Sequence, residues 1–204
     1  MSDPGSMIPI SDEQAKAIQE ALKTARGAGS YFAEVLGTVP HDIVGLLGGD
    51  WLRVKRAENA ARIVQKASER LRARNATPEP ASLSIGLPIL KAAADESREE
   101  LQDLWARLLA AAADPGRSRA FRLAFIEIVK KMDPLDAIFL LAAAESESKS
   151  LTGGQLTAIA NRTGATPDQV DISAASLKTL GVLSPPHTFV LSALGREFVR
   201  AISN

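Results

Sequence analysis

Residues 97–116, SREELQDLWARLLAAAADPG, carry the strongest structural signal in the chain. Leucines, a tryptophan and alanines recur there at steps of three and four residues, which places them on one face of an α-helix. Ser97 and Glu100 have the spacing of a capping box, and Asp114-Pro115-Gly116 is typical of a helix end. We therefore expect a helix that packs through a face formed by Leu101, Leu104, Trp105, Leu108 and Ala112.

A second long helix is predicted before it, from Trp51 to Arg74, with Asp50 as its N-cap. Its apolar face consists mostly of small residues, so another helix can approach closely: Val54, Ala57, Ala61, Val64 and Leu71. The opposite face is basic, moderated by Glu58 and Glu69, and its cations are Arg53, Lys55, Arg62, Lys66 and Arg70. We predict that this basic face binds a partner.

Neighbouring segments complete a predicted helical bundle over residues 11–147, after an N-terminal tail at residues 1–10. A capping box at Ser11 and Gln14 starts one helix, and Pro88 is expected to start a short helix that runs to Ala94. A further helix is marked by Phe121, Phe125, Ile128 and Met132, and Asp133-Pro134 provides the N-cap and first-turn proline of the next.

The last segment, residues 148–204, has a different pattern. Thr152 and Thr166 each cap a predicted helix, and Gly181 suits a left-handed helix end. Residues 182–192, VLSPPHTFVLS, predict two short strands around a Pro-Pro turn, and a final helix follows. This is the order of a winged-helix domain. The predicted fold class is therefore mainly α: a helical bundle followed by a small winged-helix-like α/β segment.

The composition limits the function classes. With 204 residues and a formal net charge of zero, no global field draws the chain to nucleic acid or to an anionic membrane. The absence of cysteine excludes disulfides, thiolate catalysis and cysteine-ligated zinc. No signal peptide or membrane-spanning run is found, so we expect a cytoplasmic protein. His41 and His187 have no nucleophile or clustered ligands around them in sequence, so we expect no catalytic site, no metal site and no cofactor.

Residues 44–56, VGLLGGDWLRVKR, admit three interpretations. A phosphate-binding loop is disfavoured, because Asp50 stands where a lysine is needed. A membrane-contacting segment would insert its apolar residues at the interface and hold its cations near lipid headgroups; these apolar residues are Leu46, Leu47, Trp51 and Leu52. The favoured interpretation is that the glycines let the chain turn into a helix whose apolar residues join the core.

Two predicted helices begin with acidic residues. The first acidic group bears on metal binding and the second on DNA binding. In residues 95–103, DESREELQD, carboxylates four residues apart suit a cation, but no second ligand cluster is near in sequence. Carboxylates in a first turn also stabilise the helix dipole, which is the favoured interpretation. Asp168 and Asp171 lie at the reading end of the second helix of the winged-helix order, with only Lys178 behind them, and would repel phosphates. We expect this segment to bind protein or to be structural.

Three stretches resemble the abortive infection alpha (Abi-alpha) family. Residues 100–115, ELQDLWARLLAAAADP, resemble its signature helix, residues 44–56 precede that helix as in the family, and residues 125–140, FIEIVKKMDPLDAIFL, resemble the following block. The resemblance spans roughly residues 24–141, and residues 191–202, LSALGREFVRAI, are similar to the tails attached to it. Several members carry an asparagine after the Leu-Trp pair, where this chain has Ala106 and Arg107. The resemblance implies a bacterial cytosolic protein of phage exclusion, without an established reaction.

Two functions follow as predictions. The first is a non-enzymatic component of phage defence that acts through protein contacts or peripheral membrane contacts of the basic helix. The alternative is a DNA-binding transcriptional regulator that uses the C-terminal segment, with nucleic acid the less favoured partner. The sequence identifies no particular protein partner and leaves homo-oligomer formation open.

Overall fold

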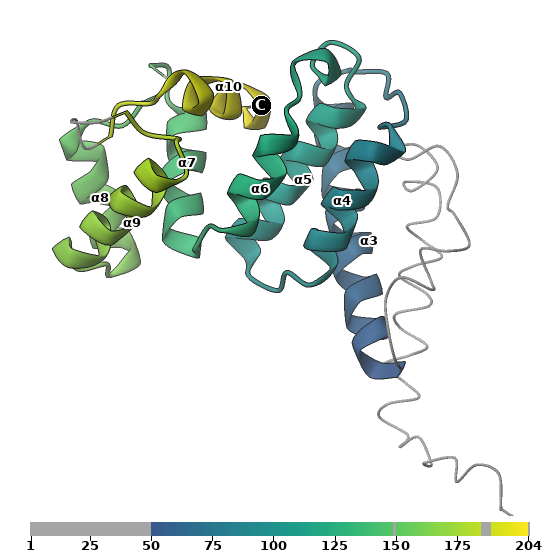
Figure 1. Cartoon of the computed structure of the whole chain (residues 1–204), viewed down its shortest axis with the longest axis horizontal. Helices are drawn as coiled ribbons and strands as arrows, with labels where there is room; N and C mark the ends of the chain where they lie inside the picture. The colour runs from purple at the N-terminus through teal and green to yellow at the C-terminus, as the bar shows by residue number, and fades with distance from the viewer. Residues whose placement is uncertain (1–49, 149, 185–188, 204) are drawn as a thin grey trace, which may run out of the picture.

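The computed structural model describes residues 50–148, 150–184 and 189–203, with side chains from residue 55 onward. These residues form eight α-helices and one short 3₁₀ helix, with no strand among them (Figure 1). The mainly α prediction is confirmed. The first helices are α3 (Asp50–Ala73), α4 (Leu83–Ala94), α5 (Glu99–Ala113), η1 (Ser118–Ala120), α6 (Leu123–Lys130) and α7 (Pro134–Glu145). They are followed by α8 (Gly153–Thr163), α9 (Pro167–Thr179) and α10 (Ala193–Ile202).

Helix α5 is the centre of the bundle. It packs against α3, α4, α6, α7 and α10, and twelve of its fifteen residues are buried. The predicted apolar face is buried as expected, with Trp105 only 2% exposed. The alanines on its other sides are buried too, because their small side chains let neighbouring helices approach from all directions.

Helix α3 packs on α5 and α4 through the predicted small-residue face, where Ala61, Val64 and Leu71 are buried. It begins one residue before the predicted start, at Asp50. The first turns of α3 extend beyond the neighbouring helices, as Figure 1 shows. One side of α3 therefore faces the core, and the exposed Lys55 and Arg62 lie outside this buried face.

Two predicted helix starts in the bundle are wrong. Helix α4 begins at Leu83, so Pro88 lies inside it rather than at its start. A proline lacks one N–H and therefore removes one helical hydrogen bond, but burial of Ile89, Leu90 and Ala93 offsets that loss. Helix α5 has Arg98 rather than Ser97 as its N-cap, without a side-chain cap. The carboxylate of Glu96 instead accepts the Arg98 backbone N–H at 2.9 Å.

The helix starts predicted in the C-terminal segment are confirmed. Thr152 caps α8 and Thr166 caps α9, each in a complete capping box with the glutamine three residues later. Gly181 has a φ of 74°, the left-handed conformation expected after α9. Helix α10 then returns to α5 and α7 and buries Phe198, Val199 and Ile202.

The predicted winged-helix-like α/β segment is not supported, because the described residues contain a single antiparallel bridge between Leu183 and Leu191 instead of two strands. Two backbone hydrogen bonds flank it, from Ser184 N–H to the Val190 carbonyl at 2.8 Å and from Ser192 N–H to the Val182 carbonyl at 2.9 Å. The described pairing ends at Ser192, which serves as the N-cap of α10.

Several predictions lie outside the described residues or side chains. They are the capped helix at Ser11, the histidines His41 and His187, the apolar residues Leu46, Leu47, Trp51 and Leu52, and the cation Arg53. Within residues 50–148, 150–184 and 189–203, none of the helices combines the length and the apolar character that crossing a membrane requires. The division of the chain at residues 147 and 148 stays a prediction.

Candidate functional site

The predicted basic face of α3 divides into exposed and internally paired cations. Lys55 has an exposed side chain and pairs with Glu58 of its own helix at 2.9 Å. Arg62 is exposed and has no ion-pair partner among the described residues. Lys66 and Arg70 are half-buried and face carboxylates of a neighbouring helix. The five predicted cations therefore do not form one uniform surface.

A ladder of ion pairs joins α3 and the residue after it to the end of α4 and to α5. Three cations of α3, and Arg74 just beyond it, meet four carboxylates that are distant in sequence, and three of these carboxylates belong to the acidic run at residues 95–103. Two pairs advance in the same direction along both helices, which shows that α3 and α5 run parallel. The ion-pair ladder consists of Arg56–Asp95, Lys66–Glu99 at 4.0 Å, Arg70–Asp103, and Arg74–Asp114 at 3.2 Å.

Three carboxylates of the acidic run, Asp95, Glu99 and Asp103, therefore pair with cations of α3, while Glu96 pairs with Arg98. No group of three metal-ligating side chains occurs among the described residues. Burial raises the pKa of Asp103, but hydrogen bonds and charges from Arg107 and Arg70 lower it more, so its pKa lies below the ordinary value. Asp103 thus stays ionised between two arginines.

Beside the ladder lies a groove of about 670 Å³. Its lining contains three cations and two carboxylates: Lys66, Arg70, Arg74, Glu69 and Asp103, together with Ala73. Because Asp103 and Asp114 already neutralise two of the cations, the groove has little free positive charge to attract an anion. Among the predicted cations of α3 whose side chains are described, the exposed ones are Lys55 and Arg62.

Arg107 on α5 is buried, with 6% of its side chain exposed, and it joins three helices. Its Nε donates to Asp103 at 2.8 Å, its Nη1 to the carbonyl of Ile202 at 2.9 Å, and its Nη2 to Glu145 at 3.0 Å. The guanidinium therefore fixes the end of α10 and the end of α7 to the centre of the bundle. A planar group with several donors suits such a three-way contact.

Arg117 holds the same end of α10 from the loop after α5. Its Nη1 donates to the carbonyl of Ser203 at 2.5 Å and to that of Ala201 at 3.3 Å. Burial lowers the pKa of Arg117, the nearby charge of Arg74 lowers it further, and Asp114 partly offsets both. A cation at a helix C-terminus stabilises the free carbonyls there.

Sequence reasoning did not identify Arg107 or Arg117 as site residues. A signal for Arg107 existed, because it is the single charged residue in the apolar run from Leu104 to Ala113. A charge in the middle of such a run is expected to be paired when the helix is buried on all sides. Its partners could not be foreseen, since Glu145 and Ile202 lie 38 and 95 residues away.

A family model described as abortive infection alpha matches residues 55–187, well over half of the chain. The chain belongs to the abortive infection alpha family. The suspected membership is confirmed, and the match extends further towards the C-terminus than the resemblance seen in the sequence. Neither the search of curated proteins nor the search of solved structures found a match.

The matched Abi-alpha region begins at Lys55 and contains the complete ion-pair ladder. It also contains a polar contact between α7 and α9, where the buried carboxylate of Asp136 accepts hydrogen bonds from the hydroxyls of Ser173 and Ser176. The name of the family links it to abortive infection, a form of phage defence. The region thus combines a tightly paired interior with exposed charges on α3 and α9.

Proposed function

We propose that this Abi-alpha protein is a non-enzymatic component of bacterial phage defence that acts by binding a partner through the exposed cations of α3. The family membership supplies the biological setting. The observation that carries the contact surface is Arg62, an exposed guanidinium without an ion-pair partner among the described residues, on a helix of 24 residues. Lys55, whose side chain is 54% exposed, lies two turns earlier on the same helix.

The ion-pair ladder determines which cations serve this contact. Lys66 and Arg70 face Glu99 and Asp103, so reversing their charge would disturb the packing of α3 on α5 as well as any partner contact. Lys55 and Arg62 avoid this problem because neither contributes to the ladder. The partner would present carboxylates to these two cations, as on an acidic protein surface.

A genetic test follows from this division. The double variant Lys55→Glu/Arg62→Glu is expected to lose phage protection in a plaque assay, because like charges at a contact weaken binding by roughly tenfold or more. The matched control is Lys91→Glu/Lys130→Glu, which changes the net charge equally on other helices. Lys130 pairs with Glu127 at 2.8 Å, as Lys55 pairs with Glu58, and Lys91 is exposed like Arg62.

The two variants separate contact from folding. Both are expected to keep the helical circular-dichroism signal and the unfolding midpoint of the parent chain, because all four side chains lie outside the core. If Lys55→Glu/Arg62→Glu protects as well as the parent chain, the proposal is wrong. If both variants lose protection equally, net charge rather than the α3 surface is responsible.

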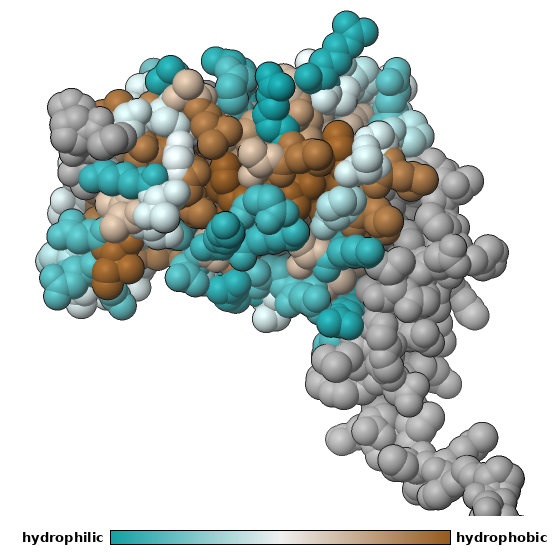
Figure 2. All heavy atoms as spheres, viewed as in Figure 1, coloured by the Kyte–Doolittle hydropathy of each residue, from teal (hydrophilic) through white to brown (hydrophobic). Residues whose placement is uncertain are grey.

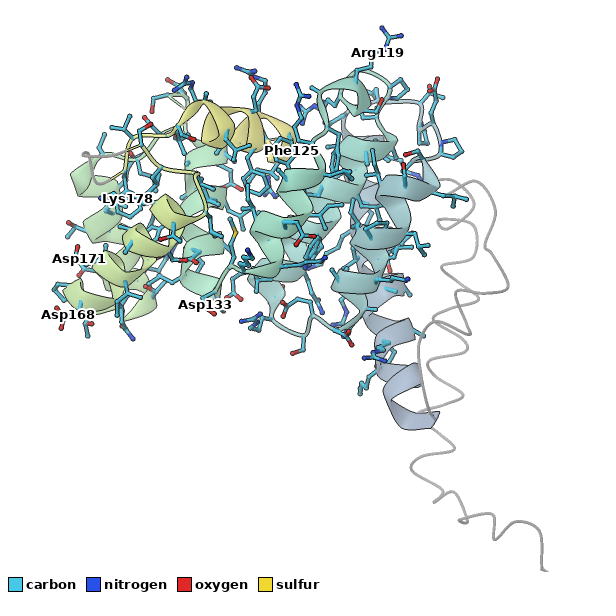
Figure 3. The ribbon with its side chains drawn as sticks, in the orientation of Figure 1. Arg119, Phe125, Asp133, Asp168, Asp171 and Lys178 are labelled. Carbon is cyan, nitrogen blue, oxygen red and sulfur yellow. The ribbon has the colours of Figure 1, made fainter. Side chains whose placement is uncertain are left out.

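Vesicle flotation distinguishes a membrane partner from a protein partner. Binding to vesicles rich in phosphatidylserine that Lys55→Glu/Arg62→Glu abolishes would identify an anionic membrane as the contact. Absence of vesicle binding, with capture of a protein by the parent chain alone, supports an acidic protein. A DNA-binding regulator is not carried forward, because the exposed side of α9 presents Asp168 and Asp171 (Figure 3).

A further inference from the structure

An apolar groove with acidic side chains lies between the start of α7 and the turn that joins α8 to α9. Its volume is about 440 Å³, and its lining includes Leu135, Ile138 and Ile172. Ile172 is 68% exposed, which is unusual for a large aliphatic side chain on a helix. Figure 2 shows apolar side chains at this end of the molecule, surrounded by hydrophilic ones. The groove is therefore a hydrophobic contact surface without a cover among the described residues.

The charge around the groove is negative. Asp133 and Asp136 line it, and no lysine or arginine does. Asp168 and Asp171 are exposed on α9, and Figure 3 shows them on the same side of the molecule as Asp133. The described cations near this rim are Arg98, whose Nη1 lies 3.5 Å from Asp133, the exposed Lys131 two residues before Asp133, and the exposed Arg162 beside the lining residue Thr163.

The groove has a firm base. The buried carboxylate of Asp136 accepts the Ser176 hydroxyl at 2.9 Å and also the Ser173 hydroxyl, so α7 and α9 are joined beneath it. A third hydrogen bond to this carboxylate, from the Asp133 backbone N–H at 3.2 Å, completes the capping box of α7. Because its base is already ordered, the groove can accept a side chain without an additional entropic cost of ordering.

A basic patch with the complementary character lies around the start of α6. Arg119 and Arg122 are exposed and have no ion-pair partner among the described residues, and Leu123 beside them is 59% exposed. The loop is anchored by edge-to-face ring contacts, with centroid distances of 5.7 Å from Phe121 to Phe125 and 5.3 Å from Phe125 to Phe198. The patch thus combines an exposed apolar side chain with two exposed guanidinium groups that have no ion-pair partner among the described residues.

The chain separates these charges along its length. Residues 115–132 contain five basic residues and one acidic residue, whereas residues 133–184 contain six acidic residues and three basic ones. In Figure 3, Arg119 extends from the opposite end of the molecule to Asp168 and Asp171. One copy therefore cannot bring its own patch to its own groove, but two copies can.

We propose that the groove of one copy receives Leu123 of a second copy, with Arg119 and Arg122 of that copy facing Asp133, Asp168 and Asp171. The volume of the groove accommodates a leucine side chain together with the aliphatic part of an arginine. If each pair of copies makes the contact once, it is heterologous and generates a ring or an open chain; if each pair makes it twice, it closes a two-fold dimer. This self-association is independent of the partner contact proposed for α3.

Light scattering coupled to size-exclusion chromatography tests the association on the full chain. At low salt the average mass is expected to exceed the 21.6 kDa of one chain and to rise with protein concentration. At about 1 M salt, where the Debye length falls to about 3 Å, the mass is expected to return towards one chain. A single-chain mass at every concentration in low salt would overturn the proposal.

The apolar part of the contact has a closely matched control. Leu123→Asp is expected to remove the association, whereas Leu83→Asp is expected to keep it. Leu83 is 61% exposed and is the first residue of α4, just as Leu123 is the first residue of α6. Association that survives Leu123→Asp, or is lost equally in both variants, would show that Leu123 does not occupy the groove.

A reciprocal charge exchange identifies the two surfaces as partners. Arg119→Glu/Arg122→Glu and Asp168→Arg/Asp171→Arg should each be a single chain alone, because like charges then meet, and a one-to-one mixture should associate again. Recovery in the mixture would not occur if the patch and the groove bound different molecules. If the groove variant lost self-association but the patch variant kept it, the groove would bind a segment other than the patch. That result would overturn the proposal.

Discussion

Replacement of Arg107 by alanine provides the most direct test of how the C-terminal helix is attached. The guanidinium is 6% exposed and holds Asp103, Glu145 and the Ile202 carbonyl together. Alanine would leave the buried carbonyl without this donor and would remove one of the two arginines that face Asp103. We expect α10 to lose much of its connection to α5 and α7.

The three contacts contribute unequally. The side chain of Glu145 is 59% exposed, so water replaces the arginine at little cost. The Ile202 carbonyl is enclosed, and an unsatisfied buried acceptor costs about 1–3 kcal/mol. Breaking a buried ion pair by removing one partner costs about 3–5 kcal/mol, but Asp103 keeps Arg70. We therefore expect a loss of about 3 kcal/mol in the free energy of unfolding.

Urea denaturation of Arg107→Ala and Arg98→Ala measures this difference. The side chain of Arg98 is 46% exposed and pairs mainly with Glu96, so its loss should cost less than about 1 kcal/mol. Hydrogen exchange should also accelerate in α10 of Arg107→Ala, because that helix loses one of the two arginines that hold its C-terminal end. Equal destabilisation by the two substitutions, or unchanged exchange in α10, would refute the assigned role of Arg107.

Two further predictions concern α10 and the ladder. A Cβ at Gly195 would lie 2.0 Å from the Val182 carbonyl oxygen, so Gly195→Ala should cost about 1–3 kcal/mol or more in thermal unfolding. Gly153→Ala, which meets nothing within 4 Å, is the control and should be nearly neutral. The net lowering of the Asp103 pKa stabilises the fold above the unfolded-state pKa of about 3.9, and the stabilisation disappears as pH falls through the lower folded-state pKa. Asp103→Asn should therefore flatten the dependence of unfolding free energy on pH in this acid range, and an unchanged slope in urea titrations would contradict the assignment.

The sequence predicted those parts of the fold that depend on neighbouring residues. The capping boxes at Thr152 and Thr166 and the Asp133-Pro134 start formed as expected, because their hydrogen bonds join residues three apart. Pro88 was placed wrongly because burial of the surrounding helix overrode a local preference. The two strands predicted in residues 182–192 are represented among the described residues by a single bridge. Strand propensity favours extended backbone but does not determine how many residues pair.

The candidate site could be predicted only in its composition. The basic residues of α3 and the acidic run at residues 95–103 were both evident, but their pairing was not. Arg56 and Asp95 are 39 residues apart, and Arg70 and Asp103 are 33 apart. Only the three-dimensional packing of α3 on α5 brings these charges together, so a face that reads as a solvated basic surface is partly an internal contact.

The arrangement of charges separates residues that hold the fold from residues available for binding. The formal net charge of zero conceals two populations. One population is neutralised within the bundle, as in the ladder and at Arg107, where a lost partner affects stability. The other population has no described counter-charge, as at Arg62 and Arg119, and its reversal should leave stability nearly unchanged. A surface that binds a partner draws most easily on the second population, because an ion pair that joins two helices must be broken before it can serve another contact. The exposed pair Lys55–Glu58 lies within one helix and costs little to break.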